Sequence, residues 1–309
     1  MPRTVNMALA QLSPRLRETG ANIEMMRKVV TEHAEADLVV FPELFLSGYT
    51  LANVDELAIH LDGKELKSVA DIARESSTAL IFGAAERVSG GVANSAVCVD
   101  ERGTIAAVYR KAQLYGGDES DAFVAGDELI VVEFCGLEIG LMICFDVEFP
   151  EVARSLARAG AEILVTISAN MEPFGNDHAV FCSARALENG LPHAYVNQVG
   201  PVEDLTFTGG STVVSPDGET HAQAGSSEEE ILSVSLILPA RSSLREDYLS
   251  KLRSPMPSVR NVPFPCETKG TGVEGVIPRH GSTQAMGRVM SPRVSPETLS
   301  RPNSTTEVK

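Results

Sequence analysis

Residues 140–151 read GLMICFDVEFPE, and this stretch joins an apolar strand to the start of a helix. The unbroken apolar run before Cys144 is typical of a buried strand, and Pro150 is a residue type favoured in the first turn of a helix. A strand-to-helix turn presents its first side chain at the carboxyl end of a sheet, where backbone N–H groups can receive a developing oxyanion. Taken alone, however, a cysteine at the end of a strand is more often a small buried apolar residue than a nucleophile. The rest of the chain must therefore decide between these two interpretations.

The same alternation of apolar strands and amphipathic helices continues on both sides of this stretch. Strands alternating with helices, together with several hairpin-like pairs, predict an α/β fold with mixed sheets. The interval 110–128 is expected to be a loop. We expect helices over 18–36, 65–76, 151–160 and 177–189, and strands over 4–10, 37–43, 78–85, 92–99, 104–109, 129–134, 137–143, 162–168, 193–199, 211–214 and 231–236.

The periodic pattern stops near residue 250, which predicts one domain over residues 1–253. Residues 254–309 contain eight of the 17 prolines and no periodic apolar run. Such a segment cannot bury enough apolar surface to offset its chain entropy. We therefore expect this basic tail to be disordered or to form an arm at an interface.

Composition excludes several classes of function. The net charge of −16 over 309 residues argues against nucleic acid as a partner, because phosphate binding needs a basic surface. An acidic body favours solubility, or alternatively an attraction for small cations. No stretch is apolar and long enough to span a bilayer, and the N-terminus lacks the pattern of a signal peptide. Five cysteines without metal-ligand spacing suit a reducing compartment, so we expect a cytoplasmic protein.

Two further strand ends carry charged residues that could activate Cys144. Glu43 ends the run LVVFPE, where an isolated carboxylate would be costly, and a partly buried glutamate can accept a thiol proton. Lys111 follows another strand and could stabilise a thiolate and then an oxyanion, while Glu119 could hold that lysine in place. Each of these charges alone is more often a solvated surface residue. None of the six histidines has a setting that selects it as the base, although His178 and His193 remain open.

Three segments in chain order resemble the signatures of the nitrilase, or carbon–nitrogen hydrolase, superfamily: VVFPELFLSGY, YRKAQLYGGDESDAFVAGDE and GLMICFDVEFPE. The resemblance extends from the first strand to about residue 240 and includes ARALENG at 184–190. It implies a four-layer α-β-β-α sandwich, usually paired into homodimers or larger homo-oligomers. It also implies Glu43 as general base, Lys111 as oxyanion-stabilising residue, Cys144 as nucleophile and Glu119 as a fourth member of the site.

The mechanism that the resemblance implies agrees with these roles. Glu43 takes the proton of Cys144, and the sulfur attacks the carbonyl carbon of a small-molecule amide. Lys111 and the backbone N–H of Phe145 hold the oxyanion, ammonia leaves, and water hydrolyses the thioester. No metal or organic cofactor is implied.

The amino-acid sequence around Cys144 and Lys111 most resembles that of the aliphatic amidase branch acting on ω-amino amides such as 5-aminopentanamide. The segment 167–174 (ISANMEPF) lies where family members line the substrate pocket, and its sequence is less like that of the family than the other segments are. We expect Glu148 or Glu172 to bind the ammonium end of such a substrate, although either is equally well explained by a helix start or a supporting role. Tyr49 and Phe174 are candidate pocket walls and equally plausible core aromatics.

Three alternatives stay open at this point. An N-carbamoyl-amine hydrolase of the carbamoylputrescine type uses the same four residues. A nitrilase also does, but true nitrilases commonly follow the cysteine with Trp-Glu, whereas Phe145 and Asp146 follow it here. A binding protein that kept the fold without catalysis belongs to another class. The intact set of buried charges argues against it.

Overall fold

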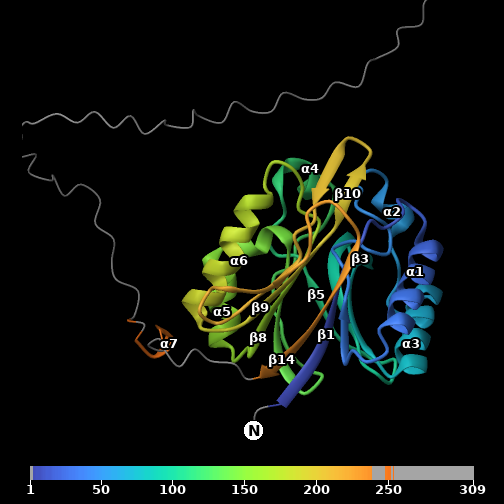
Figure 1. Ribbon diagram of the computed structural model, residues 1–309. Helices are drawn as coiled ribbons and strands as arrows, with labels where there is room; N and C mark the ends of the chain where they lie inside the picture. The colour runs from blue at the N-terminus through green and yellow to red at the C-terminus, as the bar shows by residue number, and fades with distance from the viewer. Residues whose placement is uncertain (1–2, 239–247, 252, 254–309) are drawn as a thin grey trace, which may run out of the picture. The chain divides into compact units, whose positions relative to one another are not determined.

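Two six-stranded mixed sheets form the centre of the structure, a computed structural model that describes residues 3–238, 248–251 and 253 (Figure 1). The strand orders are β14-β1-β2-β3-β4-β5 and β13-β12-β9-β8-β7-β6. In each sheet three neighbouring strands are parallel, β1-β2-β3 and β7-β8-β9, and the outer pairings are antiparallel. The strands of the first sheet are β1 (Arg3–Gln11), β2 (Leu38–Val40), β3 (Ala79–Val88), β4 (Gly91–Val99), β5 (Ile105–Arg110) and β14 (Glu230–Leu238). Those of the second are β6 (Val131–Phe134), β7 (Leu137–Ile143), β8 (Ile163–Ser168), β9 (His193–Asn197), β12 (Thr212–Val214) and β13 (Thr220–Gln223).

Helices cover the outer faces of both sheets, as Figure 1 shows. Apolar residues of α1 and α3 pack on the first sheet, and those of α5 and α6 pack on the second. The helices are α1 (Thr19–Glu32), α2 (Val54–Leu57), α3 (Lys64–Ser76), α4 (Gly116–Ala122), α5 (Pro150–Arg158), α6 (Gly175–Asn189) and α7 (Tyr248–Lys251), with a 3₁₀ turn, η1, at Cys144–Glu148. None of the described helices has the length and apolar character needed to cross a lipid bilayer.

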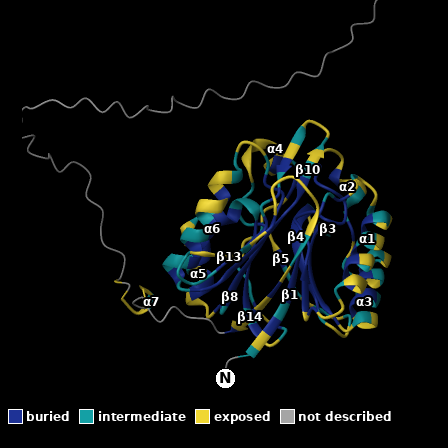
Figure 2. Cartoon of the chain, viewed as in Figure 1, coloured by how far each residue is buried: buried dark blue, intermediate teal, exposed yellow. Residues whose placement is uncertain are grey.

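The largest apolar core lies between the two sheets. Alternate residues of the central strands face each other there, among them Leu38 and Val40 of β2 and Leu141 and Ile143 of β7. The buried residues occupy both faces of the sheets and the inner faces of the helices (Figure 2). The layers are thus helix, sheet, sheet, helix, which confirms the predicted α-β-β-α sandwich.

Several elements differ from the sequence-based expectation. The interval 110–128, expected to be a loop, contains α4, a short helix that carries Glu119. The expected strand 193–199 ends at Asn197, and a separate hairpin follows, formed by β10 (Val199–Val202) and β11 (Leu205–Thr208). These elements are short and lack a clear apolar period, so pattern alone did not reveal them. The predicted tail, 254–309, lies outside the described residues.

Glycine at position 83 allows strand β3 to approach the segment that carries Glu43. A Cβ atom added there would lie 2.2 Å from the backbone nitrogen of Leu44 and 2.6 Å from the Cα of Glu43. No other residue type fits such a close backbone approach. The backbone N–H of Gly83 also donates to the Pro42 carbonyl, at 3.0 Å. The glycine thus fixes the position of the Glu43 segment against the sheet.

His193 gives the fold a dependence on pH. The ring is fully buried, and its Nε2 atom lies 2.8 Å from the Thr166 hydroxyl. Burial lowers the pKa of His193 to about 4. The unfolded imidazole binds a proton below pH about 6.5, whereas the folded one stays neutral until about pH 4, so the free energy of unfolding falls as the pH drops between these values.

We expect this residue alone to contribute a loss of about 3 kcal/mol between pH 6.5 and pH 4. Urea unfolding of His193→Gln should therefore show a weaker pH dependence in that window than the wild type. His221→Gln, at an exposed position, serves as the control and should leave the dependence unchanged. Equal slopes for wild type and His193→Gln would show that the buried ring does not titrate in this way.

Candidate active site

The ends of four elements meet at one edge of the sandwich. Cys144 follows β7 directly, Lys111 follows β5, Glu43 follows β2 by three residues, and Glu119 lies on α4. Cys144 has a φ of 45°, a left-handed conformation that non-glycine residues rarely adopt. Such strain of about 1–3 kcal/mol is characteristic of nucleophiles held at a strand-to-helix turn. The structure therefore brings the predicted residues together, with the cysteine in an unusual backbone geometry.

Glu43 is fully buried and receives N–H donors on both carboxylate oxygens. Oε1 accepts from Lys111 Nζ at 2.8 Å and from Asn94 Nδ2 at 2.7 Å. Oε2 accepts from the backbone N–H of Ala169 at 2.8 Å, across the boundary between the two sheets. A buried carboxylate needs this number of partners to offset its desolvation. Its two oxygens are consequently fixed in one orientation.

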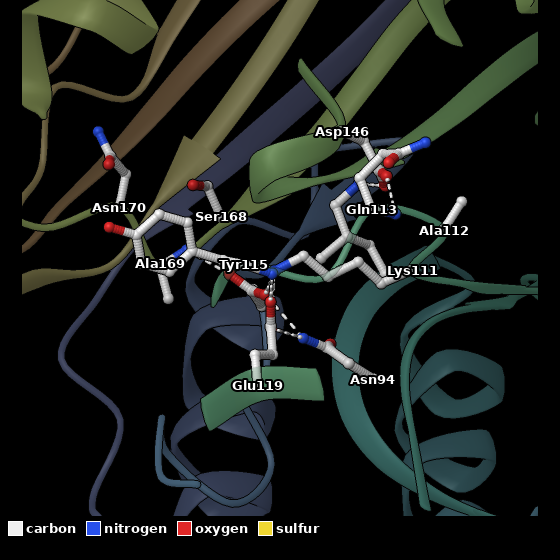
Figure 3. A network of polar contacts seen from close by, with 12 residues as sticks. Asn94, Lys111, Ala112, Gln113, Tyr115, Glu119, Asp146, Ser168, Ala169 and Asn170 are labelled. Carbon is white, nitrogen blue, oxygen red and sulfur yellow. Dashed lines mark hydrogen bonds and ion pairs between the residues drawn. The ribbon is translucent and has the colours of Figure 1, made fainter. Parts of the chain in front are cut away.

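Lys111 is the cation of this network and is 1% exposed. Its Nζ atom donates to Glu119 at 2.7 Å in addition to Glu43, as Figure 3 shows from close by for Lys111, Glu119 and Asn94. Burial alone would lower the pKa of Lys111, but the negative charges of Glu43, of the Cys144 sulfur once it is a thiolate, and of Glu119 raise it well above its ordinary value. The side chain therefore remains an ammonium ion. Its Nζ atom lies within hydrogen-bond distance of three carboxylate oxygens, one of Glu43 and both of Glu119, the second of these at 3.0 Å. One N–H shared between the two Glu119 oxygens leaves another N–H for a developing oxyanion.

Glu119 is the second carboxylate that holds the lysine, and Asn94 Nδ2 lies within hydrogen-bond distance of both Glu119 and Glu43. Burial raises the pKa of the Glu119 carboxyl, the ammonium of Lys111 lowers it, and the charge of Glu43 raises it again. Its Oε2 atom also accepts the backbone N–H of Tyr115, which anchors the first turn of α4. The carboxylate thus fixes both the lysine and the polypeptide that passes over the site.

The sulfur of Cys144 lies beside these charges and faces a pocket. Burial and the negative charge of Glu43 raise the pKa of the Cys144 thiol above its ordinary range. Lys111, the Ser168 hydroxyl and the Ala169 N–H act in the opposite direction. The resting group is therefore a thiol that needs a base, and Glu43, whose charge acts on the thiol, is a carboxylate that can serve as one.

Asp146 connects the cysteine turn to the lysine loop. It is fully buried, and its carboxylate accepts the backbone N–H of Ile143 at 2.9 Å and that of Gln113 at 2.9 Å. The Tyr109 hydroxyl donates to it at 2.7 Å. Figure 3 shows Asp146 and Gln113 in this arrangement. Because Ile143 precedes the cysteine and Gln113 follows the lysine, one carboxylate sets the spacing of both segments.

A small pocket opens over the sulfur. Aromatic rings make up much of its wall: Tyr115 packs edge-to-face on Phe145, with ring centroids 5.3 Å apart, and lies 6.1 Å from Phe174. Polar groups lie at its base and side. The lining comprises Tyr49, Lys111, Tyr115, Cys144, Phe145, Glu148, Ala169, Asn170, Met171, Phe174 and His178.

The structure separates the four residues proposed for the substrate pocket. Tyr49, Glu148 and Phe174 line it. Glu172 does not: its side chain is exposed, and it lies outside the residues that form the wall. Glu148 is the last residue of η1. Its carboxylate lies 3.5 Å from His178 Nε2, and its backbone carbonyl accepts a hydrogen bond from Arg185 at 2.9 Å. It therefore reaches the pocket rather than the solvent side of the helix start.

Sequence reasoning missed several residues of the site. Asn94, in the middle of β4, and the Ala169 N–H bind Glu43, and neither stands in a motif that would have drawn notice. Tyr115 and His178 line the pocket. His178 was available as a candidate but nothing in its neighbours selected it. For Asp146, the signal was its place two residues after the cysteine, where a carboxylate can cap the following turn.

Comparison with known proteins agrees with this arrangement. Residues 6–246 match the carbon-nitrogen hydrolase family. A hydrolase encoded in the pqqF 5′ region of Pseudomonas protegens is 38% identical over 256 residues, 81% of this chain and 90% of that protein. An (R)-stereoselective amidase of a Pseudomonas species is 38% identical over 78% of this chain and 88% of its own length. Among solved structures, a variant amidase from Nesterenkonia sp. AN1, with the acetamide moiety of fluoroacetamide on its active-site cysteine, matches with a TM-score of 0.72 and 30% identity over 81% of this chain and 94% of that one.

Proposed function

The chain belongs to the carbon–nitrogen hydrolase family, and from this premise we propose that it hydrolyses a small aliphatic amide to a carboxylate and ammonia through a thioester on Cys144. The observation that carries the proposal is the fully buried Glu43–Lys111 ion pair, at 2.8 Å, beside a cysteine that faces a small pocket. Amide hydrolysis as such has the support of the amidase relatives. The individual roles and the substrate are our proposal.

In the first half of the reaction, Glu43 accepts the thiol proton of Cys144 as the sulfur attacks the amide carbonyl carbon. The carbonyl oxygen becomes an oxyanion, which receives the remaining N–H of Lys111 and the backbone N–H of Phe145 at the start of η1. The proton on Glu43 then passes to the nitrogen, the carbon–nitrogen bond breaks, and ammonia leaves. A thioester remains on the sulfur.

In the second half, water replaces ammonia. Glu43, again a carboxylate, takes one proton from the water, and the water oxygen attacks the thioester carbon. The same two donors hold the second oxyanion. The carbon–sulfur bond breaks, the thiol regains its proton, and the carboxylic acid leaves. Side chains and water suffice for every step.

A panel assay tests the proposal and its rivals. Ammonia release is measured for 5-aminopentanamide, N-carbamoylputrescine, an uncharged aliphatic amide and a nitrile, in parallel. We expect 5-aminopentanamide and the uncharged aliphatic amide to be hydrolysed fastest. Preference for the carbamoyl compound or the nitrile would instead favour those branches, and no release from any member would favour a binding protein on the same fold. The paired or larger assembly that the resemblance implies stays a prediction.

Glu148 is the group that we propose binds the ammonium end of an ω-amino amide. Glu148 lines a pocket whose wall also contains aromatic rings, and a carboxylate together with such rings favours a cation. We expect Glu148→Gln to lower kcat/KM for 5-aminopentanamide by about tenfold, the usual effect of losing one partly exposed ion pair in a site, and to spare an uncharged amide of equal length. Glu172→Gln is the matched control, since Glu172 is exposed outside the pocket. An unchanged ratio of the two substrates in Glu148→Gln would exclude this role.

A further inference from the structure

A chain of buried polar side chains runs from the pocket wall to the nucleophile, and the mechanism above does not use it. It starts at the Glu148 carboxylate, 3.5 Å from His178 Nε2. His178 Nδ1 lies 2.8 Å from the Tyr195 hydroxyl, and the Tyr195 hydroxyl lies 3.0 Å from the Ser168 hydroxyl. The three inner members come from different elements: Ser168 ends β8, Tyr195 is in β9 and His178 is in α6.

The strand register brings the last member of the chain to the cysteine. Ile143 and Ile167 are partners in the parallel pair β7-β8, so Cys144 and Ser168 are the next residues along the same two strands. Ser168 is therefore the β8 residue next to the cysteine, and its hydroxyl favours the charged form of the Cys144 sulfur. The chain therefore has five members, with a carboxylate at one end and the reacting atom at the other.

The inner side chains of this hydrogen-bonded row are deeply buried. Ser168, His178 and Tyr195 are 0%, 2% and 3% exposed. Polar groups at such depth cost free energy unless they have partners, and Tyr195 has one on each side, His178 and Ser168. The edge-to-face contact of the His178 and Tyr195 rings, with centroids 5.6 Å apart, further fixes their orientation.

The number of protons allows two consistent directions for the hydrogen bonds. Because each hydroxyl carries one proton, a Tyr195 that donates to Ser168 leaves the Ser168 proton for the sulfur. His178 then donates to Tyr195 from Nδ1, and it must carry a second proton on Nε2 to face the Glu148 carboxylate as a donor. In the opposite direction, the thiol donates to Ser168, Ser168 to Tyr195, and Tyr195 to His178. The first direction suits a thiolate and the second a thiol.

We propose that Ser168 is the hydrogen-bond donor that stabilises the Cys144 thiolate, and that Tyr195 and His178 are positioning residues that orient its hydroxyl. As donor to the reacting sulfur, Ser168 would be a further catalytic residue, whereas the other two act through it. The inference rests on Cys144 as the nucleophile of the proposed function and adds a second stabilising group to Lys111.

Alkylation of Cys144 by iodoacetamide tests the inference without any amide turnover. The rate follows the thiolate fraction, and the modified residue is identified by mass spectrometry of peptides. A hydrogen bond to a charged group corresponds to a shift of about one pH unit, so Ser168→Ala and Tyr195→Phe should alkylate about tenfold more slowly between pH 7 and 9. Ser168→Thr, which keeps the hydroxyl, should restore most of the rate. His178→Gln should show a smaller decrease.

Thr166→Val is the matched control. It breaks the 2.8 Å contact between Thr166 and His193, which joins the same two strands two residues away from the chain. We expect its alkylation rate to equal that of the wild type, with circular dichroism confirming that all variants are folded. Unchanged rates in Ser168→Ala and Tyr195→Phe would overturn the proposal, and so would an equal decrease in Thr166→Val. Since the readout is alkylation, a protein that hydrolyses none of the panel amides can still confirm or refute it.

Discussion

Cys144→Ala should reduce ammonia release from the best amide of the panel by at least about 10⁴-fold, because removing the nucleophile removes the covalent route entirely. No other thiol can replace it: among the residues that the structure describes, the other cysteines are Cys98, Cys135 and Cys182, and none of them lines the pocket. The measurement is the steady-state rate of ammonia formation at saturating substrate.

Cys135→Ala is the control for this variant. Like Cys144, Cys135 is a partly buried thiol with a left-handed φ, here 52°, but it lies in the turn between β6 and β7. We expect this control to retain the wild-type rate within about twofold, because surface-turn substitutions seldom reach a site. Residual activity of Cys144→Ala above one per cent of wild type would show that a different group carries the reaction.

Lys111→Met should cost stability as well as activity. The substitution removes the only cation in direct contact with both Glu43 and Glu119 among the described residues. Two buried carboxylates are then left without a counter-charge, a change that typically costs about 3–5 kcal/mol. We expect this loss in the free energy of unfolding by urea at pH 7, together with loss of amide hydrolysis because the oxyanion loses its charged donor.

The pH dependence of this variant gives a second readout. Without the ammonium, the pKa of Glu119, already raised by burial, rises further, so the folded state binds a proton that the unfolded state releases above about pH 4.5. The stability deficit of Lys111→Met should therefore grow as the pH rises and shrink towards acidic pH. Lys67→Met removes the same charge from an exposed position in α3 and should stay within about 0.5 kcal/mol of wild type. A deficit that is independent of pH would mean that lost packing, not the buried charges, is its cause.

The main lines of the fold could be predicted because long apolar strands have an unmistakable pattern. The stretches around β7, β8 and β3 are continuous apolar runs, and α3 and α5 have a single apolar face, so the layered α/β architecture followed from them. The three charged residues near Cys144 were predictable for a related reason. Each follows a strand or its loop, and neighbouring strand ends meet at one edge of a sheet.

The remaining parts of the site depend on contacts that leave no periodic trace. Asn94 faces Glu43 because of the pairing of β3 with β4, and the Ala169 N–H does so because two sheets meet. The α4 helix is only seven residues long, and its first turn depends on the Glu119 carboxylate. For Glu148 and Glu172, sequence could not tell which carboxylate faces the pocket, because that depends on how the loop before α6 is folded.

The proposed reaction takes place at the boundary between the two sheets, since Glu43 and Lys111 belong to one layer and Cys144 and Ser168 to the other. Apolar packing between layers is non-directional and sets only their separation. The lateral registry is set by a few polar cross-ties, namely Ala169 N–H to Glu43, Gln198 to the Glu43 carbonyl at 2.7 Å, and Tyr109 to Asp146. If one layer slipped by about an ångström against the other, the Glu43–Lys111 pair would move away from the Cys144 sulfur while both sheets stayed intact. Catalytic competence is thereby a more sensitive measure of inter-layer alignment than foldedness itself.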